Sequence, residues 1–152
     1  MMVIAILSIT AAGVIPLMSL GGQAQVYSAA DSLAVDLNYA RNLAVTRAQV
    51  VSVRFYPDQE IYQIEDAAGE VITHPVNKKA YQVSFPADKR LSGVDIVNAS
   101  FDSTALVRFD YQGSPYNGSG NPLNSGMVTL RADSETRFVA VEPVTGVISV
   151  QY

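Results

Sequence analysis

Side chains that commonly act in catalysis or bind transition metals are scarce in this sequence. It has no cysteine and a single histidine, His74, among 152 residues. Without cysteine there is no disulfide, no thiolate metal site and no thiol nucleophile. His74 precedes Pro75 in a strand-like segment with no predictable acidic or serine partner, so we interpret it as a surface histidine. We expect no enzymatic activity and no cofactor.

Oxygen donors gather in a segment rich in Gly, Ser, Asn and Pro at residues 110–126. Four of its side chains offer oxygen atoms to a cation: Asp110, Asn117, Asn121 and Asn124. Calcium sites need several carboxylates, and this segment supplies one. Pro115 also stands where an EF-hand loop requires glycine. We therefore expect a loop without bound metal.

The same segment is the best candidate for a contact with another protein. It carries Tyr111, Tyr116 and Leu123 among flexible polar residues. Exposed tyrosines are frequent anchors of protein interfaces. The alternative interpretation is a variable surface loop without a partner.

The charge distribution makes nucleic acid an unlikely partner. The formal net charge is −4, the pI is about 4.8, and the C-terminal stretch GVISVQY has no charge. Binding to phosphates requires a basic patch. Basic residues of the second half are instead scattered among acids, as Lys78, Lys79, Lys89, Arg90, Arg131 and Arg137 show.

The first twenty residues contain no charge, and the first charged residue is Asp31. As a helix they would span about 30 Å, the thickness of a bilayer core. A secretory signal is less fitting because no Lys or Arg precedes Arg41. A buried core helix is the other alternative, but a small domain seldom surrounds so long an apolar run. We predict a single membrane span.

The helix is expected to continue past Gly21-Gly22 into an amphipathic half at residues 25–49. Its apolar side chains recur at spacings of three and four, as a helix packed on a sheet requires: Val26, Ala30, Leu33, Leu37, Ala40 and Ala44. In the first half, small residues allow close approach between helices and a proline permits a kink: Ala5, Ala11, Ala12, Gly13 and Pro16. The chain thus divides into a membrane or filament-core part, residues 1–24, and a globular domain, residues 25–152.

Residues 50–152 read as strands joined by polar turns. Alternating and β-branched segments predict strands at VVSVRF, IYQIE, EVITHPV, YQVSF, VDIVNASF, ALVRFDYQ, GMVTLRAD, TRFVAVEP and VISVQY. The predicted class is α+β, with one long N-terminal helix packed on one antiparallel sheet. Residues 110–126 are expected to form no strand.

This order of elements resembles a family. The segment VIAILSITAAGVIP is similar to the N-terminus of type IV pilin-like proteins. Ala40 to Gln49, Val51 to Phe55 and the Thr145-Gly146 pair resemble one subfamily, the minor pseudopilin H (GspH) of type II secretion and the FimT-like minor pilins. The last turn differs, because Val147 stands where that subfamily often has arginine.

The resemblance implies a structural role. Such subunits are anchored in the bacterial inner membrane by a single pass, with the globular domain in the periplasm. From there the assembly platform builds them, with other pilin-like subunits, into a pseudopilus or pilus. Members are made with a basic leader, which a prepilin peptidase cleaves before it methylates the new N-terminal amine. They also have a glutamate close to that N-terminus. Because this sequence starts inside the apolar segment, we expect those residues to precede Met1.

Two other functions stay open beside a pseudopilin that helps to assemble or cap the export filament. One is a FimT-like minor pilin that acts in pilus assembly or DNA uptake. The other is a simple membrane-anchored β-rich binding domain.

Overall fold

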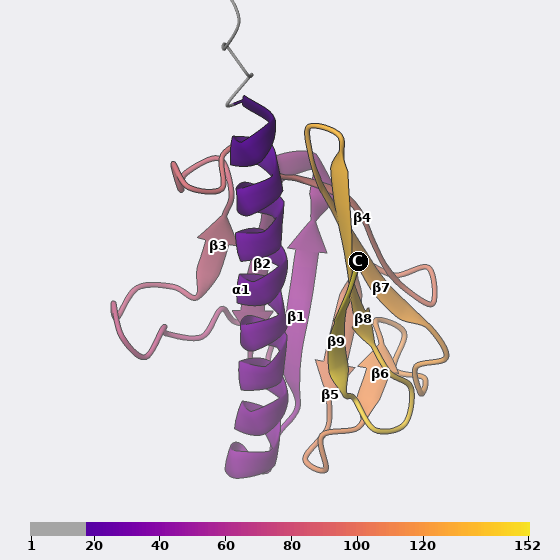
Figure 1. Cartoon of the computed structure of the whole chain (residues 1–152). Coiled ribbons are helices and arrows are strands. Elements are labelled where there is room, and N and C mark those ends of the chain that lie inside the picture. Colours follow the sequence, from indigo (N-terminus) through magenta and orange to yellow (C-terminus); the bar gives the residue numbers. More distant parts are fainter. Residues whose placement is uncertain (1–17) are drawn as a thin grey trace, which may run out of the picture.

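The structure is a computed structural model that describes residues 18–152 and the side chains from Gly21 onward. One helix, α1 (Met18–Arg47), runs along two antiparallel sheets (Figure 1). The helix lies over β1 and β2 on one side and contacts β7, β8 and β9 on the other. This arrangement confirms the predicted α+β class.

The strands divide between a five-stranded and a four-stranded sheet. The first sheet has the order β3-β2-β1-β5-β6 and the second β4-β7-β8-β9. Their bounds are β1 Val51–Tyr56, β2 Ile61–Glu65, β3 Gln82–Ser84, β4 Asp95–Phe101, β5 Leu106–Phe109, β6 Pro115–Asn117, β7 Gly126–Ala132, β8 Glu135–Val141 and β9 Ile148–Gln151. A short 3-10 turn, η1 (Pro57–Gln59), joins β1 to β2.

The expectation of one sheet is wrong, because the chain changes sheets between β4 and β5. Asp102 and Ser103 both have positive φ, 49° and 72°, and make a tight turn from Phe101 to Thr104. Apart from an isolated bridge between Phe101 and Thr104, the two strands have different partners. The first, β4, pairs with β7, whereas β5 pairs with β1 and β6. An alternating pattern predicts which face a side chain takes, and it carries no information about the partner strand.

Two local predictions also differ from the structure. EVITHPV forms no strand, since Val71 and Thr73 make only isolated bridges. The segment at 110–126, predicted without a strand, contains β6. Pro115 can begin β6 because its missing N–H removes no hydrogen bond that the strand start requires. Asn117 and Asn121 then close the turn that follows, with a backbone N–H···O distance of 2.9 Å.

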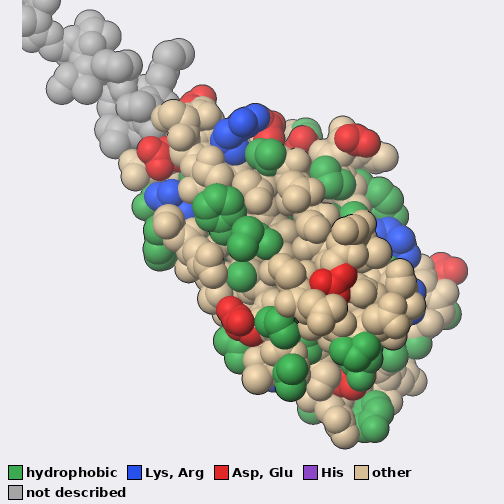
Figure 2. Space-filling model, turned by 90° about the vertical axis from the view of Figure 1, so that its right-hand side faces the viewer, with side chains coloured by type: hydrophobic (Ala, Val, Ile, Leu, Met, Phe, Trp, Pro, Cys, Tyr) green, Lys and Arg blue, Asp and Glu red, His purple; other side chains and the backbone are tan. Residues whose placement is uncertain are grey.

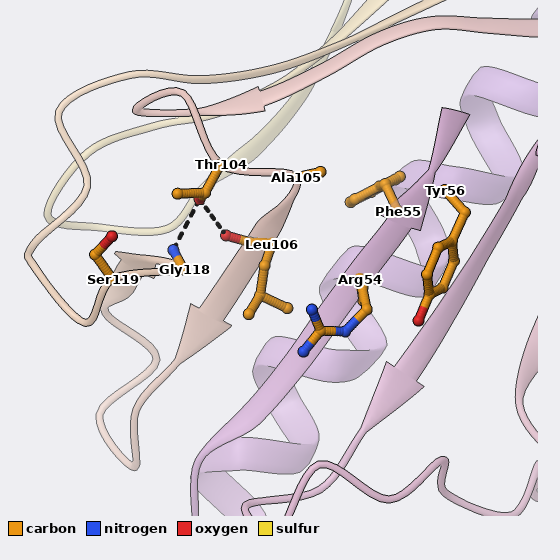
Figure 3. A pocket seen from close by; sticks show the side chains of 8 residues that line it. All are labelled: Arg54, Phe55, Tyr56, Thr104, Ala105, Leu106, Gly118 and Ser119. Carbon is orange, nitrogen blue, oxygen red and sulfur yellow. Dashed lines mark hydrogen bonds between the residues drawn. The ribbon is translucent and has the colours of Figure 1, made fainter. Parts of the chain in front are cut away.

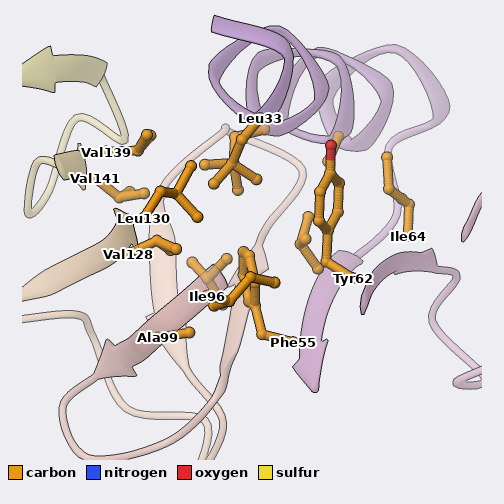
Figure 4. Close-up of a cluster of buried hydrophobic side chains, with 14 of the residues drawn as sticks. Leu33, Phe55, Tyr62, Ile64, Ile96, Ala99, Val128, Leu130, Val139 and Val141 are labelled. Carbon is orange, nitrogen blue, oxygen red and sulfur yellow. The ribbon is translucent and has the colours of Figure 1, made fainter. Parts of the chain in front are cut away.

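The core lies where the helix meets both sheets. All six side chains of the apolar stripe are 0% exposed: Val26, Ala30, Leu33, Leu37, Ala40 and Ala44. Figure 4 shows Leu33 between Val128, Leu130, Val139 and Val141 of one sheet and Phe55, Tyr62 and Ile64 of the other. Full burial of a leucine stabilises the fold by about 1.5–3 kcal/mol. The helix is therefore part of the core of both sheets.

The helix ends at Arg47, two residues before the expected boundary, through a left-handed residue. Ala48 has φ 52°, and its N–H donates to the carbonyl of Val45 at 3.3 Å. The N–H of Gln49 donates to the carbonyl of Ala44 at 3.1 Å. These two bonds form a Schellman motif, in which glycine usually occupies the left-handed position. The alanine methyl makes this conformation costly.

We predict that Ala48→Gly raises the free energy of unfolding by about 1 kcal/mol, because glycine adopts positive φ without strain. Urea unfolding followed by circular dichroism measures the change. Ala24→Gly, at an exposed position within α1, is the control and should lower stability by about 0.5–1 kcal/mol. Equal effects of the two glycines would contradict this account of the helix end.

Candidate functional site

One flank of α1 is held to the five-stranded sheet by a polar cluster of one half-buried carboxylate and two buried tyrosines. The hydroxyl of Tyr62 donates to Oδ2 of Asp36 at 2.6 Å, and that of Tyr81 donates to Oδ1 at 2.8 Å. Tyr62 is 0% and Tyr81 6% exposed. Each carboxylate oxygen thus satisfies one tyrosine hydroxyl that would be costly to bury alone. The cluster fixes the rotation of the helix on the sheet.

Burial determines the protonation of this cluster. Desolvation raises the pKa of Asp36 above its ordinary 3.8, although both tyrosine hydroxyls favour the charged form. Burial, followed by the nearby Asp36 charge, raises the pKa of Tyr62 and the pKa of Tyr81. Both tyrosines therefore stay protonated and act as donors at physiological pH.

His74 closes the outer side of the cluster. Its ring lies 4.4 Å from the ring of Tyr81, centroid to centroid. Its Nδ1 accepts hydrogen bonds from the N–H groups of Val76 and Asn77, at 3.1 and 3.3 Å. The histidine thus orders its own turn and packs on Tyr81. Among residues 18–152, no serine forms a hydrogen bond with His74.

Nearer its C-terminal end, α1 is also bound to two loops; we call the Asp36 cluster and this second contact the two joints of α1. Arg41 Nε donates to the carbonyl of Gly113 at 3.1 Å. Gly146 has φ 67°, and a Cβ there would lie 2.6 Å from that same carbonyl and 3.1 Å from Arg41 Nε. The Thr145-Gly146 pair therefore has a packing reason: only glycine lets the last turn approach the bond between Arg41 and Gly113.

In the segment at residues 110–126, two of the four candidate oxygen donors accept hydrogen bonds from the backbone of the loop itself. Asp110 Oδ1 accepts the N–H groups of Gln112 and Ser114, both at 2.9 Å. Asn117 Oδ1 accepts those of Ser119 and Asn121, at 3.0 and 3.1 Å. From residue 18 onward no group of three acidic or histidine side chains could hold a metal.

The three predicted contact residues of this loop separate in the structure. Tyr111 is 60% exposed, and Tyr116 is half-buried on the outer face of β6. Leu123 is 3% exposed and packs beneath Gly126 next to Phe101. Leu123 is therefore a core residue, and the prediction that it contacts a partner is wrong. The fold of the loop removes the apolar side chain of Leu123 from water.

The residues predicted to pack in a membrane or filament lie outside the described residues: Ala5, Ala11, Ala12, Gly13 and Pro16. In the chain from residue 18 to 152, no helix combines the length and the apolar character that a membrane span needs.

On the face that Figure 2 displays, positive and negative side chains are mixed. Lys and Arg side chains there lie beside Asp and Glu rather than in a basic patch. Phosphate backbones are held by clustered positive charge.

Sequence reasoning missed both joints of α1. Asp36 and Arg41 lie beside the apolar stripe and read as solvent-facing residues. Their partners, Tyr62, Tyr81 and Gly113, are remote in sequence and give no local signal. Gly146 was detectable only as part of the resemblance to the family.

Comparison with known proteins now places the chain. The family model of type II transport protein GspH matches residues 29–145, so the chain belongs to the GspH family. The matched stretch contains the larger part of α1, the Asp36 cluster, the Arg41–Gly113 bond and every strand except β9, and it ends one residue before Gly146. No curated protein matches the sequence.

Solved structures of this architecture include two kinds of minor subunit. The minor pseudopilin EpsH from the type 2 secretion system of Vibrio cholerae has a TM-score of 0.61 and 13% identity, over 84% of this chain and 96% of that one. The type IV minor pilin FimU of Pseudomonas aeruginosa has a TM-score of 0.55 and 15% identity, over 86% and 90%. At such identities the likeness shows the fold alone. It confirms the pilin-like architecture.

We predict that Asp36→Asn changes how stability depends on pH. Because the pKa of Asp36 is raised in the folded protein, its contribution is complete below pH 3.8 and is lost as pH rises through that raised pKa. Asparagine can still accept from one tyrosine and donate to the other. The free energy of unfolding of the unsubstituted protein, relative to that of the variant, should therefore fall as pH rises from 3.8 through the raised pKa of Asp36.

Urea unfolding at a series of pH values measures this difference. Asp31→Asn, which removes an exposed carboxylate from the same helix, controls for the loss of one charge. If the unsubstituted protein instead became more stable relative to Asp36→Asn as pH rises, the pKa of Asp36 would not be raised in the folded protein.

We predict that Gly146→Ala is more destabilising than Gly120→Ala. Both glycines have positive φ, 67° and 84°, so each substitution costs about 1 kcal/mol of backbone strain. No atom lies within 4 Å of a Cβ at Gly120, whereas one at Gly146 meets the Gly113 carbonyl. The excess for Gly146→Ala, measured by chemical denaturation, should be at least about 1 kcal/mol. Equal losses would mean that the joint does not constrain the last turn.

Proposed function

We propose that this protein is a minor pseudopilin subunit that helps to assemble or cap the filament of a type II secretion system. The observation that carries the proposal is the GspH family match over residues 29–145. In this role residues 1–24 anchor the subunit in the bacterial inner membrane and later pack in the filament core. The globular domain lies in the periplasm or on the filament surface. Its partners are other pilin-like subunits and the inner-membrane assembly platform, and it performs no reaction.

The joints of α1 support a mechanical role. Both sheets, the Asp36 cluster and the Arg41–Gly113 bond hold one helix. A subunit that is pulled from the membrane or pushed along a filament by its helix must transmit that force to its outer domain. A helix buried in two sheets and locked by hydrogen bonds at two points does so without sliding.

A FimT-like role in pilus assembly or DNA uptake is the second candidate, because the minor pilin FimU has the same fold. Uptake of DNA would require phosphate contacts. A net charge of −4 and an uncharged C-terminal stretch favour the secretion role. A simple anchored binding domain would need no second subunit.

We predict that Gly13→Leu prevents incorporation into filaments without unfolding the outer domain, because a large side chain keeps neighbouring helices apart. Cells that lack the native copy are complemented with each variant, and sheared filaments are probed for the protein. Ile15→Leu, which preserves side-chain volume, is the control and should be incorporated normally. Protease resistance of the cell-bound protein checks that the domain stays folded. Normal recovery of Gly13→Leu in filaments would contradict the packing proposal.

A further inference from the structure

The five-stranded sheet has an outer face that α1 does not cover. On β1, Val51, Val53 and Phe55 face the core, so Ser52, Arg54 and Tyr56 face outward. The strand register places Ser52 between Glu65 on β2 and Arg108 on β5. Tyr116 on β6 lies directly opposite Arg108. In the next row Arg54 lies between Gln63 and Leu106.

The charges on this face are unevenly paired. Glu65, which is 3% exposed, accepts from Arg54 Nε at 2.8 Å and from Gln63 Nε2 at 2.7 Å. Within residues 18–152 no acidic side chain lies within ion-pair distance of Arg108, and its buried Nε has no hydrogen-bond partner. One carboxylate thus serves one arginine, and the second guanidinium is left with unused donors.

Two aspartates lie at the edge of this face. Asp110 uses Oδ1 for the N–H groups of Gln112 and Ser114. Asp66 likewise accepts from Ala68 and Glu70 with its Oδ1. Each aspartate uses one carboxylate oxygen to hold its own turn, and neither lies within ion-pair distance of Arg108.

Three adjoining hollows follow Arg54 and Arg108 across the sheet. The first, of about 300 Å³, lies between Arg54, Leu106 and the Thr104–Gly118 contact (Figure 3). The second, of about 270 Å³, shares Arg54 and Leu106 and reaches Arg108. The third, of about 210 Å³, joins Arg108 to Tyr116. The second hollow shares lining residues with each of the other two, so the three hollows lie side by side across this face, and together we call them the groove. Leu106 and Ser52 lie in its floor, and Glu65, Asp66 and Asp110 also line it.

We propose that this groove binds an extended polypeptide segment by pairing one of its carboxylates with Arg108. A guanidinium presents a planar fork of N–H donors that a carboxylate accepts in pairs. Leu106 and the ring of Tyr116 offer apolar contact on either side of that charge. The two aspartates at the edge disfavour a doubly charged phosphate more than a single carboxylate. The site is independent of whether the chain enters a filament, and therefore goes beyond the function proposed above.

The test uses the full chain in micelles of an uncharged detergent and two synthetic pentapeptides. One is the acetylated and amidated peptide Val-Glu-Val-Glu-Val, and the other has glutamine in place of both glutamates. Nuclear magnetic resonance follows the Nε–Hε signal of Arg108 and gives both dissociation constants. We expect the glutamate peptide to shift this signal and to bind about tenfold more tightly or better, as a charge-assisted hydrogen bond requires.

Arg108→Gln should abolish the difference between the peptides. Arg131→Gln, which removes an exposed arginine from β7 of the other sheet, is the control and should preserve it. If Arg108→Gln fails to fold, Arg108→Lys replaces it. The lysine variant retains the charge without the planar fork and should reduce the preference severalfold.

Three results would overturn the proposal: equal binding of the two peptides, a preference that survives both Arg108 variants, or tighter binding of inorganic phosphate than of the glutamate peptide.

Discussion

The structure depends on one constraint: a single helical face must fill the junction of two sheets. The helix meets this constraint by placing two large side chains between pairs of small ones. Ala29, Ala30, Ala40 and Ala44 let the backbone approach the strands, and Leu33 and Leu37 fill the space between them. Neither sheet has another helix among the described residues to cover its inner face. Removal of α1 would therefore expose both sheets together.

Burial of the stripe does not by itself set the rotation or the axial position of the helix, since apolar contacts are non-directional. The polar joints supply that direction. Asp36 binds two tyrosine hydroxyls near the middle of α1, and Arg41 binds a loop carbonyl one and a half turns later. The second joint also brings the last turn, through Gly146, against the same carbonyl. Elements from both ends of the globular domain thus meet on one helix.

Part of this arrangement can be predicted from local patterns in the sequence. A 3.6-residue period identifies the face with Leu33 and Leu37, and the alternation in β7 and β8 identifies their inward side chains. Three features had no local signal. The left-handed pair Asp102-Ser103 sends the chain to a second sheet, β6 arises in a polar loop, and Leu123 is buried by that loop. Asp36 read as a solvent-facing residue because its partners, Tyr62 in β2 and Tyr81 just before β3, lie 26 and 45 residues away in the sequence. Such pairings are made by the tertiary fold and cannot be inferred from neighbours along the chain.

The family match and the fold describe a subunit whose helix belongs to its domain. Native-state hydrogen exchange of the full chain in detergent tests this claim most directly. The account predicts that amides of α1 between Val26 and Ala44 exchange with the same free energy as the central amides of β1 and β8, because helix and both sheets open as one unit. Exchange of the helix amides at a much lower free energy than either sheet would contradict it, since the helix could then detach while the sheets stay folded.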